Sequence, residues 1–356
     1  MRKKPLIVKE TFVVSILLVV STIVFGTFYT YWNTAEPTKT CASCHEINSS
    51  VETFSTSAHA TLQCSKCHGT ALSNGFHSLK EKGMMVVNHV RSKNQPDIAM
   101  NENQVLAVME NCVKCHSAEH AAWLSGGHSV TYKDILLHTK HNQTELLNFD
   151  CLRCHGMFSD VNITELVKPI DKTGPWNLVN GEMASKPAIP CLACHQVHRR
   201  GITKIAPGYA NPKQIFYART KAEPKAGFYN RHDKTYISAE NLPQLKLWNH
   251  QSVVTVSDDP LMRICVQCHA PNAWHQAGTG DDKTPLGVHE GLSCIACHDA
   301  HSNNAQKSCA RCHPAISNCN LDVTTMNTSF ADSLSKNDIH TVACADCHKN
   351  EKPKKN

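Results

Sequence analysis

The chemistry that this sequence suggests comes from cysteines and histidines at a fixed spacing. Residues 191–198 read CLACHQVH, in which two residues separate the cysteines and a histidine follows the second cysteine directly. The same CxxCH pattern occurs nine times and contains eighteen of the 19 cysteines, which leaves only Cys319 outside it. The nine copies are CASCH (41–45), CSKCH (64–68), CVKCH (112–116), CLRCH (151–155), CLACH (191–195), CVQCH (265–269), CIACH (294–298), CARCH (309–313) and CADCH (344–348).

A repeated CxxCH is the attachment signature of c-type haem. Two thiols bond to the two vinyl groups on one porphyrin edge, and the histidine that comes next lies under the iron as its proximal ligand. A zinc site does not need a histidine after each cysteine pair, and neither a redox dithiol nor a disulfide framework needs one. The pattern therefore predicts nine covalently attached haem c groups, each holding one iron.

The predicted ligands are read directly from the motifs. The thioether cysteines are Cys41, Cys44, Cys64, Cys67, Cys112, Cys115, Cys151, Cys154, Cys191, Cys194, Cys265, Cys268, Cys294, Cys297, Cys309, Cys312, Cys344 and Cys347. The proximal iron ligands are His45, His68, His116, His155, His195, His269, His298, His313 and His348.

Fourteen of the 23 histidines remain for the opposite side of the nine irons. Neutral imidazole is a good iron ligand, so every haem could have two histidines, and such haems carry electrons rather than bind substrate. Histidines close to a motif cannot reach over their own haem but can bind a neighbouring iron. The distal candidates are His59, His120, His128, His141, His198, His250, His289, His301 and His340. The less favoured histidines are His77, His89, His138, His232 and His275.

The N-terminus predicts a membrane anchor over residues 1–32. No charged residue occurs from Thr11 to Trp32, and 22 residues span about 33 Å, enough for a bilayer core. Arg2 and three lysines precede this stretch, and aromatic residues end it, which favours a cytoplasmic N-terminus and a periplasmic remainder at a bacterial inner membrane. The alternative is a cleaved signal peptide.

The rest of the chain is expected to be mostly α-helical with much irregular structure, organised around packed haems. We predict a linker at 33–40, a first haem module at 41–195, a haem-free basic insert at 196–264 and a second haem module at 265–356. Residues 101–116 have a helical pattern that Asn101 or Asn103 could cap. The formal charge of +6 is expected to balance haem propionates, and no nucleic-acid surface is predicted.

Residues 1 to 120 resemble the NapC/NirT family of membrane-anchored multihaem quinol dehydrogenases. The likeness is carried by the anchor, by CASCHEINSSVETFSTSAHATLQCSKCHG, by HSLKEKGMMVVNHV and by NENQVLAVMENCVKCH. It implies a quinol site near the first haem, with Lys80 or Lys82 beside the headgroup. Some members carry an iron-binding Met at the position of Ile47, so here the first haem is expected to use His45. The haems of the motifs after residue 120 would extend the part of the chain that resembles this family.

Three functions remain open at this point. The first is transfer of electrons from menaquinol or ubiquinol to a periplasmic partner protein, with possible quinol dehydrogenase activity. The second is a relay subunit of a larger membrane complex that never meets quinol. The third is a reductase or oxidase of a small nitrogen or sulfur compound, with one open haem near Tyr229, Arg231, His232 and Tyr236. Those four residues could instead form a loop bonded to propionates, and no catalytic residue is assigned.

Overall fold

The computed structural model describes residues 6–34, 47–69, 87, 89–91, 99–198, 226–244, 246–249, 251–254, 256–269 and 289–302. Six of the nine CxxCH motifs fall in these ranges. The first, eighth and ninth motifs, with their predicted cysteines and proximal histidines, lie outside the described residues. So do His250, His340, Lys80, Lys82 and Cys319.

The chain forms two compact units. The first covers residues 1–55 and 59–98, and the second covers residues 56–58 and 99–356. Helices take up about half of the described residues, strands are short, and the remainder is irregular. The expected combination of helix and irregular structure is therefore confirmed, whereas its organisation around packed haems stays a prediction.

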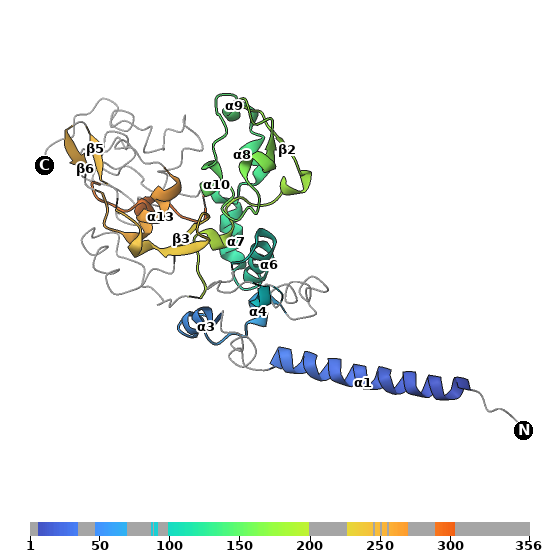
Figure 1. Ribbon diagram of the computed structural model, residues 1–356. Coiled ribbons are helices and arrows are strands. Elements are labelled where there is room, and N and C mark those ends of the chain that lie inside the picture. The colour runs from blue at the N-terminus through green and yellow to red at the C-terminus, as the bar shows by residue number, and fades with distance from the viewer. Residues whose placement is uncertain are drawn as a thin grey trace, which may run out of the picture. The chain divides into compact units, whose positions relative to one another are not determined.

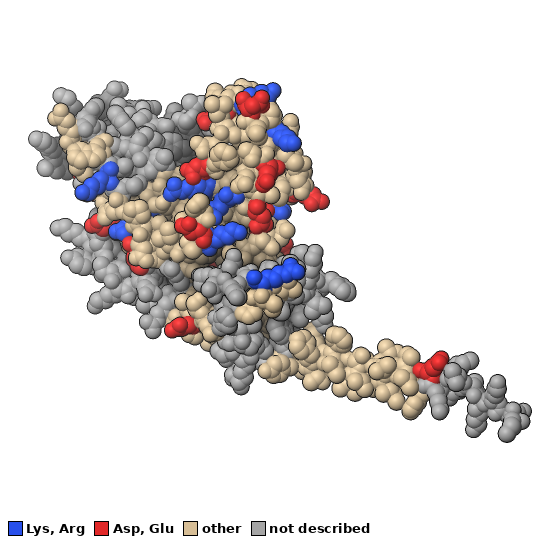
Figure 2. Space-filling view, in the orientation of Figure 1, with Lys and Arg blue, Asp and Glu red and all other residues tan. Residues whose placement is uncertain are grey.

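The first unit contains the long N-terminal helix α1 (Leu6–Thr34) and two short helices, α3 (Asn48–Ser55) and α4 (Ser65–His68). The α1 stretch Glu10–Tyr31 has 22 residues with a hydropathy of 2.3, and none of it is buried in the protein. Figure 2 shows no charged side chain along most of this helix. The hydroxyls of Thr22 and Thr30 donate to carbonyl oxygens of the preceding turn at 2.8 Å, so they need no water.

Helix α1 is thus long and apolar enough to cross a membrane. This supports the predicted anchor by length and composition. Its orientation, its retention in the mature protein and the identity of the membrane stay predictions.

The second unit begins with α6 (Glu102–Val113), which carries the start of the third CxxCH motif. Asn101 is its N-cap: the Asn101 side chain accepts from the Gln104 N–H, and the Gln104 side chain accepts from the Asn101 N–H, both at 2.9 Å. Such a capping box satisfies two backbone donors that the first helical turn leaves over. Of the two expected capping residues, Asn101 is confirmed, and Asn103 instead accepts a hydrogen bond from Lys186.

Short elements come after α6 along the chain (Figure 1). They are α7 (Ser117–Leu124), η2 (Gly127–Ser129), α8 (Tyr132–Leu136), α9 (Thr139–Asn142), α10 (Cys151–Cys154), α11 (Ile163–Leu166), β1 (Val167–Lys168), β2 (Asn177–Leu178), η3 (Gly181–Met183) and η4 (Cys191–Ala193). The later elements are β3 (Gly227–Asn230), β4 (Thr235–Ser238), η5 (Ala239–Asn241), β5 (Leu247–Asn249), β6 (Ser252–Val254), α13 (Pro260–Cys268) and α14 (Cys294–Cys297).

Each described sheet is a two-stranded antiparallel pair: β1 with β2, β3 with β4, and β5 with β6. In the β3–β4 hairpin Gly227 pairs with Ser238 and Asn230 pairs with Thr235. Strand β3 also contacts α13 (Figure 1). The described residues of the expected insert therefore include two hairpins, and one of them packs beside the sixth CxxCH motif.

Two apolar clusters form the described core of the second unit. One joins α6, the chain after α10, η4 and the β3–β4 hairpin, through Val105, Val108, Met157, Phe158, Leu192, Ala193, Phe228, Tyr229 and Leu242. The other joins α8, α10, α11, β1 and η3 through Tyr132, Leu136, Leu152, Ile163, Leu166, Val167, Trp176 and Met183. The third, fourth and fifth motifs thus stand on elements that these clusters hold together.

Candidate functional site

Every described CxxCH motif folds as one helical turn. The histidine N–H donates to the carbonyl oxygen of the first cysteine at 2.8 to 3.0 Å in all six cases. A hydrogen bond between residues four apart closes an α-helical turn, which places the two cysteines, three positions apart, on the same side. The six turns belong to α4, α6, α10, η4, α13 and α14. The same local geometry therefore recurs in different surroundings.

The structure describes twelve cysteines, all of them in these motifs, and none of these twelve is in a disulfide bond. Neither cysteine of a pair is bonded to the other, as a redox dithiol in its oxidised form would require. Since the spacing places both cysteines of each turn on the same side of the helix, the pair can bond to a flat group with two attachment points.

The fourth and sixth motifs are in contact although they lie far apart in the sequence. Arg153 donates from Nη2 to Oε1 of Gln267 at 3.0 Å, and Cys154 Sγ lies 3.8 Å from the Gln267 carbonyl oxygen. A hydrogen bond between the Cys154 and Cys268 thiols lowers the pKa of Cys154 and raises that of Cys268. The second cysteines of two motifs therefore face each other.

Cys265, the first cysteine of the sixth motif, also lies near the fifth and seventh motifs. Burial raises the pKa of Cys194 to about 12, and the neighbouring Cys265 adds to that shift. Burial likewise raises the pKa of Cys294 to about 12, with Cys265 the next contributor. Asp259, which caps α13 by accepting from the Leu261 N–H at 3.0 Å, accepts a hydrogen bond from Ser293 before α14. The sixth motif is thus the centre of a group of four.

Two histidine pairs each join a predicted proximal ligand to a predicted distal one. The rings of His195 and His301 have centroids 5.8 Å apart and planes 11° apart. The rings of His128 and His269 have centroids 6.1 Å apart and planes 58° apart. Burial lowers the pKa of His195, with His301 and His116 contributing, and burial lowers that of His269, with His128 contributing. These shifts favour neutral imidazole, the form that binds metals.

The other predicted distal ligands are spread over both units. His120 stacks on Trp123 within α7, with centroids 5.7 Å apart. His59 precedes α4 in the first unit, and His141 lies in α9. The remaining two that the structure describes, His198 after η4 and His289 before α14, adjoin the fifth and seventh motifs. The structure leaves the role of these five as predictions.

Three of the four residues proposed for an open haem connect the β3–β4 hairpin to earlier segments of the second unit. Tyr236 donates from its hydroxyl to the Leu192 carbonyl oxygen at 2.6 Å. Arg231 donates from Nη2 to the carbonyl oxygens of Ser159 and Val161 at 3.1 and 2.7 Å. Tyr229 stacks on Phe158 at 4.1 Å, whereas His232 is exposed. These contacts are with protein groups, and the expected bonds to propionates stay a prediction.

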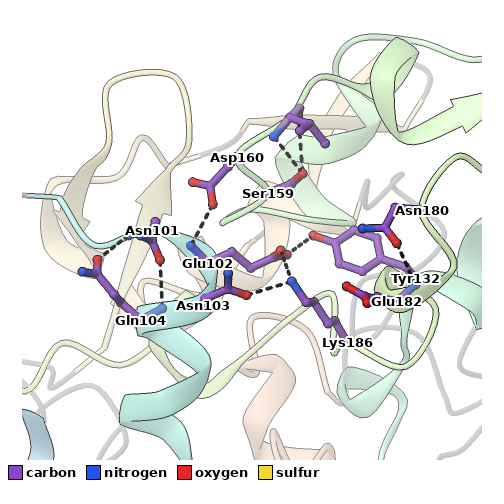
Figure 3. A network of polar contacts seen from close by, with 11 residues as sticks. Asn101, Glu102, Asn103, Gln104, Tyr132, Ser159, Asp160, Asn180, Glu182 and Lys186 are labelled. Carbon is purple, nitrogen blue, oxygen red and sulfur yellow. Dashed lines mark hydrogen bonds and ion pairs between the residues drawn. The ribbon is translucent and has the colours of Figure 1, made fainter. Parts of the chain in front are cut away.

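The sequence did not predict a buried polar network at the start of α6 (Figure 3). Glu102, only 5 % exposed, accepts from the Tyr132 hydroxyl at 2.6 Å and from Lys186 Nζ at 3.2 Å. Burial raises the pKa of Tyr132 well above its ordinary value, and the neighbouring Glu102 is the next largest contribution to this shift. Asp160 accepts from the Glu102 N–H at 3.3 Å. The network ties the start of α6 to α8 and to the segment before η4.

Among the described residues no group of three or more His, Cys, Asp or Glu side chains is arranged to hold a metal ion. A haem iron needs at most two side chains, since the porphyrin supplies its other four nitrogens.

No protein-family model, no curated protein and no solved structure matches this chain. The likeness to the NapC/NirT family therefore rests on the sequence motifs alone.

Proposed function

We propose that this protein is a membrane-anchored multihaem c-type cytochrome that passes electrons from the membrane quinol pool to a periplasmic partner protein. The observation that carries the proposal is the recurrence of one turn in all six described CxxCH motifs. In each turn two thiols lie on one side and a histidine comes next, which is the donor set that haem attachment needs. A structural zinc site would not require the histidine to recur in this place.

The motif residues would have separate tasks. The cysteines would fix one porphyrin edge, and the histidine would bind the iron and set the tilt of the ring. Bound haem supplies the one-electron couple, and the protein tunes it through the axial ligands, burial and nearby hydrogen bonds. Around the fifth motif, Leu192 and Ala193 are buried in the larger apolar cluster, which would shield that haem from water.

The chain would deliver these haems to the membrane surface through α1. Residues 10–31 are apolar enough to hold the unit at a bilayer, and the positive residues before them favour a cytoplasmic N-terminus. The resemblance to quinol dehydrogenases adds Lys80 and Lys82 as candidates near the quinol headgroup. A partly buried cation there would stabilise negative charge that develops on the quinone oxygen.

The haem content tests the first part of the proposal. We expect the mass of the denatured protein to exceed that of the polypeptide by nine haems, and a pyridine haemochrome spectrum to give the same number. Replacing both Cys191 and Cys194 by Ala should remove one haem, while Cys319→Ala should remove none. Protein produced with the haem-attachment machinery but carrying no covalent haem, or carrying zinc instead, would overturn the proposal.

Quinol reactivity tests the second part. In membrane vesicles, a quinol analogue should reduce the haems of the double variant Lys80→Gln and Lys82→Gln more slowly than those of the unmodified protein. Reduction by dithionite and the haem count should be unchanged. Lys133→Gln, an exposed lysine of α8, is the matched control and should react like the unmodified protein. If the unmodified protein accepts no electrons from any quinol, the chain is instead a relay subunit of a larger complex.

A further inference from the structure

Residues 299–302, directly after the seventh motif, contact both of the histidine pairs, His195 with His301 and His128 with His269. The Ala300 carbonyl oxygen lies 2.9 Å from Nδ1 of His128, and the next residue, His301, presents its ring to His195. Asp299 holds this segment in a turn, because its Oδ1 accepts from the His301 N–H at 2.8 Å and from the Ser302 N–H at 3.4 Å. We name residues 299–302 the clamp.

The ring separations match two ligands on one metal. An imidazole nitrogen binds a transition metal at about 2 Å and lies about 1 Å from its ring centroid, so rings on opposite sides of one metal have centroids about 6 Å apart. His195 and His301 are stacked at 5.8 Å, and His128 and His269 are tilted at 6.1 Å. Binding one iron would require the ligating nitrogens of each pair to face each other. The metal fixes this distance but not the angle between ring planes, so interplanar angles of 11° and 58° are both compatible.

The Ala300 contact is of the kind that orients a histidine for metal binding. A carbonyl oxygen can only accept, so Nδ1 of His128 carries the hydrogen and its Nε2 lone pair is left for a metal. Ligating histidines commonly donate their other N–H to a backbone carbonyl in this way, which fixes the tautomer and the ring orientation. The partner of His128, His269, lies across from it in the sixth motif.

The loop that carries His128 packs closely against the clamp at Gly126. Gly126 has ordinary backbone angles, φ −100° and ψ 166°, so its conformation does not demand glycine. A Cβ at this position would fall onto the His301 carbonyl oxygen and would lie 3.2 Å from the Ser302 Cα. The absence of a side chain at Gly126 therefore allows the backbone of this loop to approach the backbone of the clamp.

We infer that the clamp sets the distal ligands of two different irons: His301 for the iron bound by His195, and His128, oriented by the Ala300 carbonyl, for the iron bound by His269. This inference rests on the proposed function and names a ligand set that the sequence alone left open. Because one four-residue segment serves both sites, movement of the clamp changes the coordination of the fifth and sixth haems together.

Carbon monoxide counts the open irons and tests the assignment. His301→Ala and His128→Ala should each bind one more CO per reduced protein than the unmodified chain, and the double variant should bind two more. Each single variant should also convert one low-spin iron to high spin in the electron paramagnetic resonance spectrum. The control Lys133→Ala, at an exposed residue of α8, should change neither quantity.

Two further variants keep the test decisive if an alanine variant loses a haem or folds poorly. His301→Met should keep six ligands and the full haem count but raise the midpoint potential of one haem, as methionine ligation does. Gly126→Ala leaves every proposed ligand in place, so altered low-spin signals from two haems would show that the clamp positions both. Added imidazole should abolish the extra CO binding of His301→Ala.

The clamp and the proposed function fail in different ways. An unmodified protein without covalent haem would overturn the function. A protein with its full haem count, in which His301→Ala and His128→Ala bind no additional CO and keep all irons low-spin, would overturn the clamp alone. The two ring contacts would then be packing between histidines that bind other irons or none.

Discussion

The buried Glu102 network yields a prediction whose magnitude can be worked out from its contacts. Tyr132 is fully buried and Glu102 is 5 % exposed, and the Tyr132 hydroxyl oxygen lies 2.6 Å from the Glu102 carboxylate oxygen. Lys186 Nζ lies 3.2 Å from the same carboxylate, within ion-pair distance. Tyr132→Phe should therefore weaken the local structure by about 1.5–3 kcal/mol, the range for hydrogen bonds to charged groups.

A second tyrosine provides a matched control. Tyr236 donates to the neutral Leu192 carbonyl oxygen, also at 2.6 Å, so Tyr236→Phe should cost only about 0.5–1.5 kcal/mol. The two substitutions remove the same atom and differ in the charge of its acceptor. In the background Glu102→Gln, where the acceptor is neutral, the effect of Tyr132→Phe should fall to that of Tyr236→Phe.

Amide hydrogen exchange is the suitable assay, because a chain with several bound cofactors need not unfold in one step. The Tyr132 N–H donates to the Lys186 carbonyl and the Lys133 N–H donates to the Ala184 carbonyl, both at 3.1 Å. Exchange of these two amides should accelerate about 10- to 150-fold in Tyr132→Phe, since 1.4 kcal/mol corresponds to a factor of ten. Equal acceleration by the two tyrosine substitutions, each at its own site, would refute a buried charged acceptor.

Three more predictions concern other parts of the chain. Asn101→Ala should destabilise the first turn of α6 by about 0.5–2 kcal/mol through loss of the cap, measured by exchange of its amides. Gly156→Ala should cost about 1–3 kcal/mol, seen as faster exchange around α10, because φ is 143° and the new Cβ would lie 2.9 Å from atoms of Leu152 and Tyr132. Leu17→Arg should oppose membrane insertion by about 2.5–3.5 kcal/mol, which would lower the fraction of protein that resists alkaline extraction from membranes.

The local features of this protein were predictable from sequence. A CxxCH turn is closed by a hydrogen bond between residues four apart. The N-terminal cap of α6 is formed by hydrogen bonds between residues three apart. Both are specified by neighbouring residues, so spacing and residue type suffice. The apolar N-terminal helix is equally local, since its length and composition are read directly from 22 consecutive residues.

Contacts between distant segments could not be predicted in this way. Glu102 looks in sequence like an ordinary acidic residue of a first helical turn, which is favourable there when exposed. Its partner Lys186 is 84 positions away, and no periodicity links the two. Likewise, the spacing after His298 predicted that His301 would bind some other iron, but only the fold brings it to His195.

The gap between the fifth and sixth motifs suggested two separate haem modules, and this domain division stays a prediction. Described residues from both sides of the gap nevertheless lie in one compact unit. Arg153 contacts Gln267 across it, and His128 faces His269. A long segment without motifs therefore need not divide the chain into separate units, because here its β3–β4 hairpin packs against α13.

The way in which the sixth and seventh motifs are held bears on what bound haem would contribute. The two apolar clusters include no residue of α13 or α14 among their fully buried members. Each helix has one buried apolar residue outside these clusters, Met262 in α13 and Ala296 in α14. Polar contacts add to this burial: Asp259 and Ser293, each 2 % exposed, bond to each other, and Arg263 donates to the carbonyl oxygens of Glu240 and Leu242. Hydrogen bonds of this kind orient elements well but contribute little net stability compared with burial of apolar surface. Porphyrin faces packed between the motifs would supply that apolar surface, and the proposed cofactor and the fold of this region would then depend on each other.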